Sequence, residues 1–428
     1  MRIEKITVKN LFRTFDHVIP LNMDDRITII HGPNGFGKST LLKMMEGVLK
    51  SRYSEICAIP FDEFGLFFQD GAFIKIIKET PQEDLLQLVY SLGADVRTVE
   101  LDLRFEPEEL DFPPYMIEEW IPELDRVGVR LWRHISTGIS FSLRAVLEHY
   151  GDRLPDYDAT YLEPESEELR DLGDSVNVRM IETQRLSSDS HQLDHRTFAV
   201  SAYSKELSEA IEVKLAEYAT LSQSLDRTFP FRLIEHSSQS GLTKDEIDQA
   251  LGELEKKRAQ LRDVGLLERE EDVSPLEAID ETTMNVLSVY IEDTRTKLGI
   301  FDEMAAKIEL LRNTVNSRFR YKQMSVSKKD GFIFTTADGK ILPPTSLSSG
   351  EQHTLVVLYE LLFKVEPNSM ILIDEPELSL HVEWQVNFLA ALQKITELAS
   401  LDILMATHSP DIINDRWDLT VELQGPTQ

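Results

Sequence analysis

The fold is decided by a stretch of ten residues, His31-Gly32-Pro33-Asn34-Gly35-Phe36-Gly37-Lys38-Ser39-Thr40. An apolar segment, residues 27–30, precedes it, and a second apolar segment, residues 41–49, follows. The stretch contains the pattern G-x-x-x-x-G-K-[ST], in which backbone N–H groups of a glycine-rich loop surround phosphate oxygens at the start of a helix. Such a loop requires the order strand, loop and helix. The sequence therefore predicts an α/β fold with a phosphate-binding loop.

The residue types in this loop suit separate tasks. Lys38 is expected to bridge the terminal phosphates of a nucleotide, and the hydroxyl of Ser39 is expected to bind Mg²⁺. Thr40 is expected to support the loop from behind. The remaining expected nucleotide contacts come from the loop itself: Gly32, Asn34, Gly35 and Gly37.

A further apolar segment, residues 370–373, ends in Asp374-Glu375. A buried strand here would bring both carboxylates to its C-terminal end, beside the phosphate loop. Asp374 is expected to hold Mg²⁺ through water, and Glu375 to orient and deprotonate the attacking water. By itself an apolar run before Asp-Glu is equally typical of an ordinary turn at a strand end. The presence of the phosphate loop favours the catalytic interpretation.

Two more segments complete a series of motifs. Leu347-Ser348-Ser349-Gly350-Glu351-Gln352 lies about 20 residues before the apolar segment 370–373, and Thr407-His408-Ser409-Pro410 follows the apolar segment 403–406. The first is also typical of a helix N-cap, and the two interpretations are compatible because a helix start offers N–H groups to phosphate. In this order the segments resemble the signature, Walker B and switch-histidine motifs of ABC ATPases, as found in RecF, SMC and overcoming-lysogenisation proteins.

The resemblance implies functions for particular residues. The signature residues of one subunit would complete the ATP site of a second subunit, in a head-to-head homodimer that binds ATP and Mg²⁺: Ser348, Ser349, Gly350 and Glu351. His408 would contact the γ-phosphate. Gln184 lies where SMC-like heads carry an Mg²⁺-binding glutamine, and Arg13 resembles an arginine near their first strand, although a solvated arginine fits its position equally well.

The same resemblance implies an ABC-type head with a helical, short coiled-coil arm inserted between two lobes. We expect an N-terminal ATPase lobe at residues 1–199 with an acidic insertion at about 80–175, a helical arm at 200–325, and a C-terminal ATPase lobe at 326–428. Apolar residues at helical spacing predict the helices of the arm, and Pro230 and Pro275 are expected to break them. A projecting antiparallel arm and a compact helical domain both fit this pattern.

Composition limits the classes of function. The single cysteine, Cys57, excludes a disulfide framework and indicates a reducing compartment, which we expect to be the cytoplasm. We expect no membrane segment, because no stretch approaches about 20 apolar residues. The net charge of -30 repels nucleic acid on average, so any DNA contact is expected to be local or indirect. The longest acid-free basic stretch, residues 312–329, is interpreted as a solvated helix end in preference to a phosphate-binding patch.

Three short segments, residues 182–186, 225–230 and 377–381, resemble the PtuA ATPases of Septu anti-phage systems and retron-associated ATPases. Those ATPases work with a separate HNH nuclease. The resemblance implies an ATPase subunit that regulates such a partner and has no nuclease domain of its own, since only about 20 residues follow the switch-histidine motif. Two alternatives remain open. One is a RecF- or SMC-like DNA clamp, and the other is a switch that binds ATP and scarcely hydrolyses it.

Overall fold

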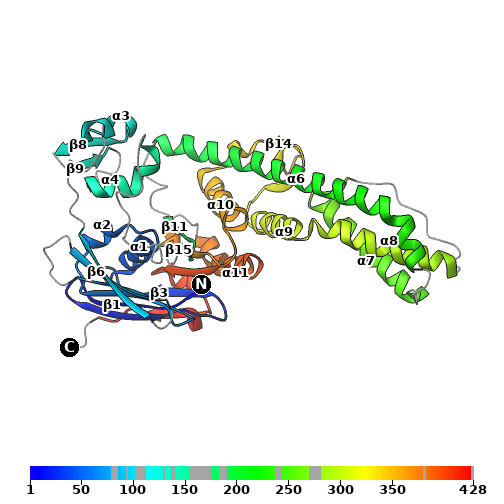
Figure 1. Cartoon of the computed structure of the whole chain (residues 1–428). Coiled ribbons are helices and arrows are strands. Elements are labelled where there is room, and N and C mark those ends of the chain that lie inside the picture. Colours follow the sequence, from blue (N-terminus) through cyan, green and yellow to red (C-terminus); the bar gives the residue numbers. More distant parts are fainter. Residues whose placement is uncertain are drawn as a thin grey trace. The chain divides into compact units, whose positions relative to one another are not determined.

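The computed structural model describes residues 1–78, 85–92, 95–102, 112–128, 131–135, 140–154, 173, 175–182, 190–236, 242–268, 281–378 and 382–425. The chain forms two compact units, which are residues 1–189 together with 365–428, and residues 190–364. The second unit is therefore inserted into the first (Figure 1). Its limits differ from the predicted boundaries at 199/200 and 325/326, so that the signature-like segment belongs to the inserted unit.

A five-stranded parallel sheet forms the centre of the first unit, with the strand order β11-β15-β16-β3-β17. Its strands are β3 (Ile27–His31), β11 (Val178–Glu182), β15 (Met370–Asp374), β16 (Asp402–Ala406) and β17 (Thr420–Glu422). Helices α11 (Val382–Ala399) and α12 (Pro410–Ile413) belong to the same unit. The central strands are buried along nearly their whole length, as is typical of parallel strands. The predicted α/β class is confirmed.

A six-stranded antiparallel sheet, in the order β2-β1-β4-β5-β6-β7, is the second layer of this unit. Its strands are β1 (Ile3–Leu11), β2 (Phe15–Pro20), β4 (Glu63–Phe68), β5 (Phe73–Ile77), β6 (Leu85–Leu92) and β7 (Asp95–Asp102). Helix α1 (Lys38–Leu49) shares one apolar core with both sheets. The last two strands lie in the segment that we predicted to be an insertion. They extend the sheet of the head.

The next part of that segment has a small core of its own. It contains α3 (Ile117–Trp120), β8 (Leu124–Gly128), β9 (Leu131–His134), β10 (Ser140–Ser142) and α4 (Leu143–Tyr150). The Trp132 side chain is fully buried at its centre, among apolar residues of α3 and α4. Glu148 on α4 accepts hydrogen bonds from Ser54 in the short helix α2 (Tyr53–Cys57), which connects this part to the head.

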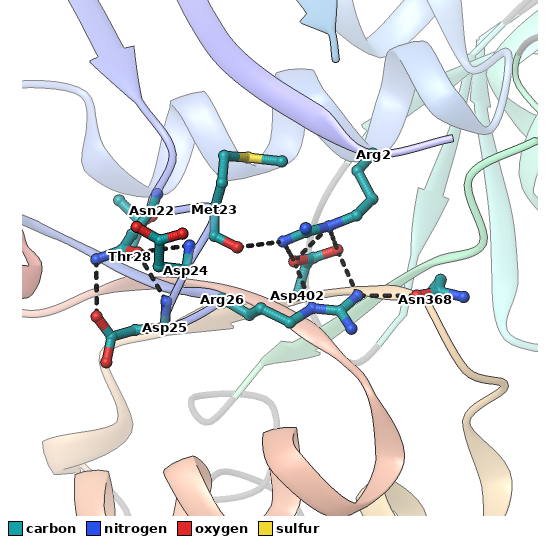
Figure 2. A network of polar contacts seen from close by, with 9 residues as sticks. All are labelled: Arg2, Asn22, Met23, Asp24, Asp25, Arg26, Thr28, Asn368 and Asp402. Atoms are coloured by element: carbon teal, nitrogen blue, oxygen red, sulfur yellow. Dashed lines mark hydrogen bonds and ion pairs between the residues drawn. The ribbon is translucent and has the colours of Figure 1, made fainter. Parts of the chain in front are cut away.

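An ion-pair network joins both sheets at the edge where the parallel strands begin (Figure 2). The carboxylate of Asp402, the first residue of β16, accepts hydrogen bonds from Arg2 and Arg26. Arg2 also donates to the carbonyl of Met23 at 3.1 Å, and Arg26 donates to the side chain of Asn368 at 3.0 Å. The network therefore links the starts of β1, β3, β15 and β16 at the edge opposite to the phosphate loop.

The inserted unit is mainly helical, as predicted. Its helices are α6 (Ser190–His236), α7 (Lys244–Asp263), α8 (Glu281–Gly299) and α9 (Asp302–Asn316). Figure 1 shows α6 as one long helix, and its 47 residues correspond to about 70 Å. Helix α7 begins with a capping box of Thr243 and Glu246. No described helix of the chain is long and apolar enough to cross a membrane.

The expectation that Pro230 breaks the helical run is wrong, because α6 continues through it to His236. Proline removes one backbone donor from a helix and usually bends or ends it. Here side chains supply donors to the neighbouring turn, since Thr228 and Arg232 both donate to the carbonyl of Leu225. Arg232 also forms an ion pair with Asp293 of α8, which holds this turn against a second helix. The other proline of that expectation, Pro275, lies outside the described residues.

A small sheet and the signature-like segment follow α9. The strands are β12 (Lys322–Ser327), β13 (Gly331–Thr336) and β14 (Ile341–Leu342), and β13 and β14 form a hairpin with Gly339 in the turn. Helix α10 (Ser349–Tyr359) starts directly after them. Tyr203 of α6 stacks on Tyr359 of α10, so the first part of α6 and the signature helix belong to one packed region.

Candidate functional site

The phosphate loop leaves the C-terminal end of β3 and enters α1 as predicted. Gly37 is the N-cap of α1 and has a φ of 90°, in the left-handed region that favours glycine. A Cβ atom on Gly37 would lie 2.5 Å from Cδ2 of Leu11, the buried last residue of β1. Glycine is therefore required here both by the backbone and by the space. Asn34 and Gly35 are exposed at the mouth of the loop.

Lys38 is buried, with 5% of its surface exposed, and its ammonium group lies inside the loop. Its Nζ donates to the carbonyls of Gly32 at 2.8 Å and Pro33 at 3.1 Å. These neutral carbonyls do not neutralise the ammonium charge. An anion that enters the loop would therefore meet an enclosed positive charge at the start of a helix.

Ser39 and Asp374 meet at the edge where the parallel strands end. The Ser39 hydroxyl donates to Oδ1 of Asp374 at 2.9 Å, although 335 residues separate them. Asp374 is the last residue of β15 and lies in register with Ala406 of β16. A hydroxyl and a carboxylate at this separation are oxygen donors of the kind that Mg²⁺ prefers. Two of the three predicted magnesium ligands, Ser39 and Asp374, are thus brought together, while Thr40 is partly buried in the first turn of α1.

Glu375 follows directly, at a sharp turn. Its φ is 45°, an uncommon conformation for a residue with a side chain, and its N–H donates to the carbonyl of Ala406 at 2.9 Å. Backbone strain of this kind is often found at functional sites. The turn ends the strand at Asp374 and places Glu375 next to the predicted magnesium ligands in the chain.

The switch-histidine segment follows β16 at the same edge. The N–H of Thr407 donates to the carbonyl of Ile30 at 3.1 Å, which ties the segment to the strand before the phosphate loop. The His408 side chain is 44% exposed, and its Nδ1 lies 3.0 Å from Oε1 of Glu377. Sequence reasoning assigned no function to Glu377. The signal that could have found it is a third carboxylate closely following Asp374-Glu375.

Side chains of β2 support the phosphate loop from the antiparallel sheet. Nε2 of His17 donates to the carbonyl of Phe36 at 3.1 Å, and the rings of Phe15 and Phe36 are 4.9 Å apart. Burial lowers the pKa of His17, so its ring is neutral at neutral pH. Arg13 is exposed in the turn between β1 and β2, with a φ of 59°. Gln184, which the resemblance to SMC-like heads makes an expected Mg²⁺ ligand, lies outside the described residues.

The signature-like residues form a helix start in the inserted unit. Ser348 is the N-cap of α10 and forms a capping box with Glu351, while Ser349 and Gly350 occupy its first turn. Glu351 also pairs with Lys322 at 2.7 Å. Burial opposes ionisation of Glu351, but hydrogen bonds from Lys322 and Ser348 outweigh it and lower its pKa. The N-cap interpretation is confirmed, and a contact of these residues with nucleotide remains a prediction.

Several basic side chains of the stretch 312–329 form ion pairs with acidic residues of the same unit. Ion pairs join Arg312 to Asp263, Lys322 to Glu351 and Lys328 to Glu268. Burial also lowers the pKa of Arg318 to about 10. These contacts favour the interpretation that the stretch is structural and is not a phosphate-binding patch.

Comparison with known proteins adds the family. A search of curated proteins finds no match. Among solved structures, the Smc head domain of Pyrococcus furiosus, with an extended coiled coil and bound to the C-terminal domain of ScpA, is 13% identical with a TM-score of 0.33, over 96% of this chain and 91% of that chain. The SMC head domain of Thermotoga maritima is 12% identical with a TM-score of 0.33, over 96% of this chain and 91% of that chain. The family model described as AAA ATPase domain matches residues 1–413. Because this match spans nearly the whole chain, the protein belongs to the AAA ATPase domain family.

Proposed function

We propose that this ATPase binds ATP at the edge formed by the ends of β3, β15 and β16 and hydrolyses it there. The main evidence for the proposal is that the buried Lys38, the hydrogen-bonded pair of Ser39 and Asp374, and the turn at Glu375 all lie where β3 and β15 end. Lys38 would bind the terminal phosphates, and Glu375 would orient the attacking water and take its proton. This combination supplies charge stabilisation and a base, which are the two requirements of phosphoryl transfer to water.

Mg²⁺ is the metal that these residues suit. The Ser39 hydroxyl and the Asp374 carboxylate offer the hard oxygen ligands that it prefers, and Gln184 would be a further ligand by resemblance. When bound, the ion would neutralise charge on the phosphates. Ser39→Ala and Asp374→Asn should therefore weaken the magnesium dependence of ATP binding, which can be measured by titration calorimetry with and without Mg²⁺.

The signature helix supports a dimer in which two chains share two nucleotides. Ser348, Ser349 and Gly350 begin α10 with N–H groups of the kind that bind phosphate. In the resemblance to ABC ATPases these groups serve the nucleotide of the partner chain. Hydrolysis should then depend on protein concentration, and ATP should shift the protein from monomer to dimer in analytical ultracentrifugation.

In the cell, we infer that the ATPase regulates a separate nuclease of the HNH type in an anti-phage defence complex. Its net charge of -30 and the ion-paired basic stretch 312–329 support a protein that leaves DNA contact to a partner. The alternative is a RecF- or SMC-like clamp that binds DNA itself.

One pair of measurements separates the two functions. The chain is expressed with its neighbouring genes, purified in ATP and Mg²⁺, and analysed for proteins that co-purify in stoichiometric amount. DNA binding of the isolated chain is then measured at several salt concentrations. A bound nuclease and no DNA binding support the defence function. Salt-dependent DNA binding that is weakened on neutralising Arg320 and Lys329, the exposed basic residues of the stretch 312–329, supports the clamp.

A further inference from the structure

Glu377 is a carboxylate held almost entirely inside the protein. It lies in the turn η8 (Pro376–Leu378), and its side chain is only 6% exposed. A buried carboxylate requires hydrogen-bond donors or charge partners to remain ionised. The donors to Glu377 come from Thr407 and His408, some 30 residues further along the chain.

The contacts determine how the imidazole of His408 lies. The hydroxyl of Thr407 donates to Oε2 of Glu377 at 2.8 Å, and the N–H of His408 donates to Oε1 at 2.9 Å. Nδ1 of His408 is 3.0 Å from the same Oε1. An ionised carboxylate only accepts, so Nδ1 carries the proton in this contact. The nitrogen left for a ligand is Nε2, on a side chain that is 44% exposed.

A second layer of hydrogen bonds fixes Thr407 and the main chain of Glu377. The hydroxyl of Thr407 accepts from the N–H of Ser409 at 3.0 Å, so its own proton is directed to Glu377. The hydroxyl of Ser409 donates to Gln385 of α11 at 2.8 Å, and Gln385 donates to the carbonyl of Glu377 at 3.2 Å. Glu377 is therefore held from both sides, by the segment that follows β16 and by α11. Such support is typical of residues that position another group.

We propose that Glu377 is a positioning residue for ATP hydrolysis, which holds His408 with Nε2 toward the terminal phosphate. This inference rests on the proposed function, in which His408 contacts that phosphate. Phosphate oxygens are acceptors, so Nε2 binds one only by donating a proton. Nδ1 then donates to Glu377 and Nε2 to the phosphate, so the His408 ring bridges two anionic groups. Glu377 supplies the negative charge on the protein side.

Steady-state kinetics of four variants test the inference: Glu377→Ala, Glu377→Gln, His408→Ala and the double variant Glu377→Ala/His408→Ala. We expect Glu377→Ala to lower kcat by about 10- to 100-fold, the range found when a residue that orients a ligand is removed, with little change in the KM for ATP. Glu377→Gln keeps an acceptor for Nδ1 and should lose less. The double variant should be no slower than His408→Ala alone, because both changes remove the same contact.

Nitrogen NMR of the histidine rings reports which ring nitrogens of His408 are protonated. Substitution of a residue with a purely structural role would not change this. In the full-length protein with a non-hydrolysable ATP analogue, the His408 signals are identified by their absence from the His408→Ala variant. We expect both ring nitrogens to be protonated in the natural protein and this state to be lost in Glu377→Ala. Glu148→Gln is the matched control, since Glu148 is also a buried carboxylate that binds a hydroxyl and lies on α4. It should leave the His408 signals unchanged.

The outcomes distinguish failure of the proposed role of His408 from failure of the positioning role of Glu377. If His408→Ala hydrolyses ATP at the natural rate, the proposed role of His408 fails, and the role of Glu377 fails with it. If His408→Ala is slow while Glu377→Ala keeps its kcat and its His408 signals, only the positioning role is overturned. The positioning role would also be overturned if the decreases in kcat multiply, so that Glu377→Ala slows the His408→Ala variant as much as it slows the natural protein. In that case Glu377 acts independently of His408.

Discussion

Asp402→Asn should lower the free energy of unfolding of the first unit by more than a polar substitution usually does. Asp402 binds two arginines, with the shortest distance 2.6 Å to Arg2 and 3.0 Å to Arg26 (Figure 2). Asparagine removes the charge and leaves one acceptor oxygen for both guanidinium groups. Breaking a buried ion pair costs about 3–5 kcal/mol. The side chains here are 11–23% exposed, so we expect about 2–4 kcal/mol.

The same network predicts how stability depends on pH. Burial opposes ionisation of Asp402, but hydrogen bonds from Arg26 and Arg2 outweigh it and hold its pKa below the usual range. The unfolded chain therefore binds this proton more readily than the folded protein. The stabilisation is complete above the unfolded pKa of about 3.9 and is lost as the pH falls through the lower folded value. Asp402→Asn should remove this contribution to acid unfolding.

Urea unfolding of the natural protein and the variant measures the effect, and Asp418→Asn is the matched control. Asp418 also pairs with an arginine, Arg416 at 2.8 Å, but its side chain is 57% exposed. An exposed pair contributes about 1 kcal/mol or less. If Asp402→Asn lowers the free energy of unfolding no more than Asp418→Asn does, the ion-pair network does not connect the two sheets energetically.

Two further changes test the loop and the signature helix. Gly37→Ala forces a methyl group to within 2.5 Å of the buried Leu11 at a φ of 90°; we expect loss of ATP binding by calorimetry and a cost of about 1–3 kcal/mol in thermal unfolding. Glu351→Ala removes the capping box with Ser348 and the ion pair with Lys322, and should lower the stability of the inserted unit by about 1–2 kcal/mol in urea unfolding. Unchanged stability of this variant would show that the helix start is held by other contacts.

The parts of the fold that sequence predicted are those encoded by local patterns. The phosphate loop follows from glycines and a lysine at fixed spacing, and β15 follows from a short apolar run before Asp374. The helix start at Ser349 follows from Ser348, which lies three residues before Glu351. In each case the responsible side chains are neighbours in the chain, so no long-range contact had to be known.

Contacts between distant segments explain what was missed. Strands β6 and β7 were assigned to an insertion because the pairing of β6 with β5, which joins them to the sheet of the head, leaves no local signal in the sequence. Around Pro230, α6 is held by the ion pair of Arg232 with Asp293, which lies about 60 residues further along the chain on α8. The contact of Glu377 with His408 spans 31 residues of sequence. Each of these features becomes visible only when the chain is folded.

The most direct test of the central claim is single-turnover ATP hydrolysis by Glu375→Gln, with ATP binding measured separately. The account predicts that binding is retained and that hydrolysis falls by about 100-fold or more, because glutamine cannot accept the proton of the attacking water. Glu422→Gln, an exposed glutamate at the same edge of the sheet, is the control and should hydrolyse ATP at the natural rate. Unchanged turnover in Glu375→Gln would contradict the assignment of the catalytic base.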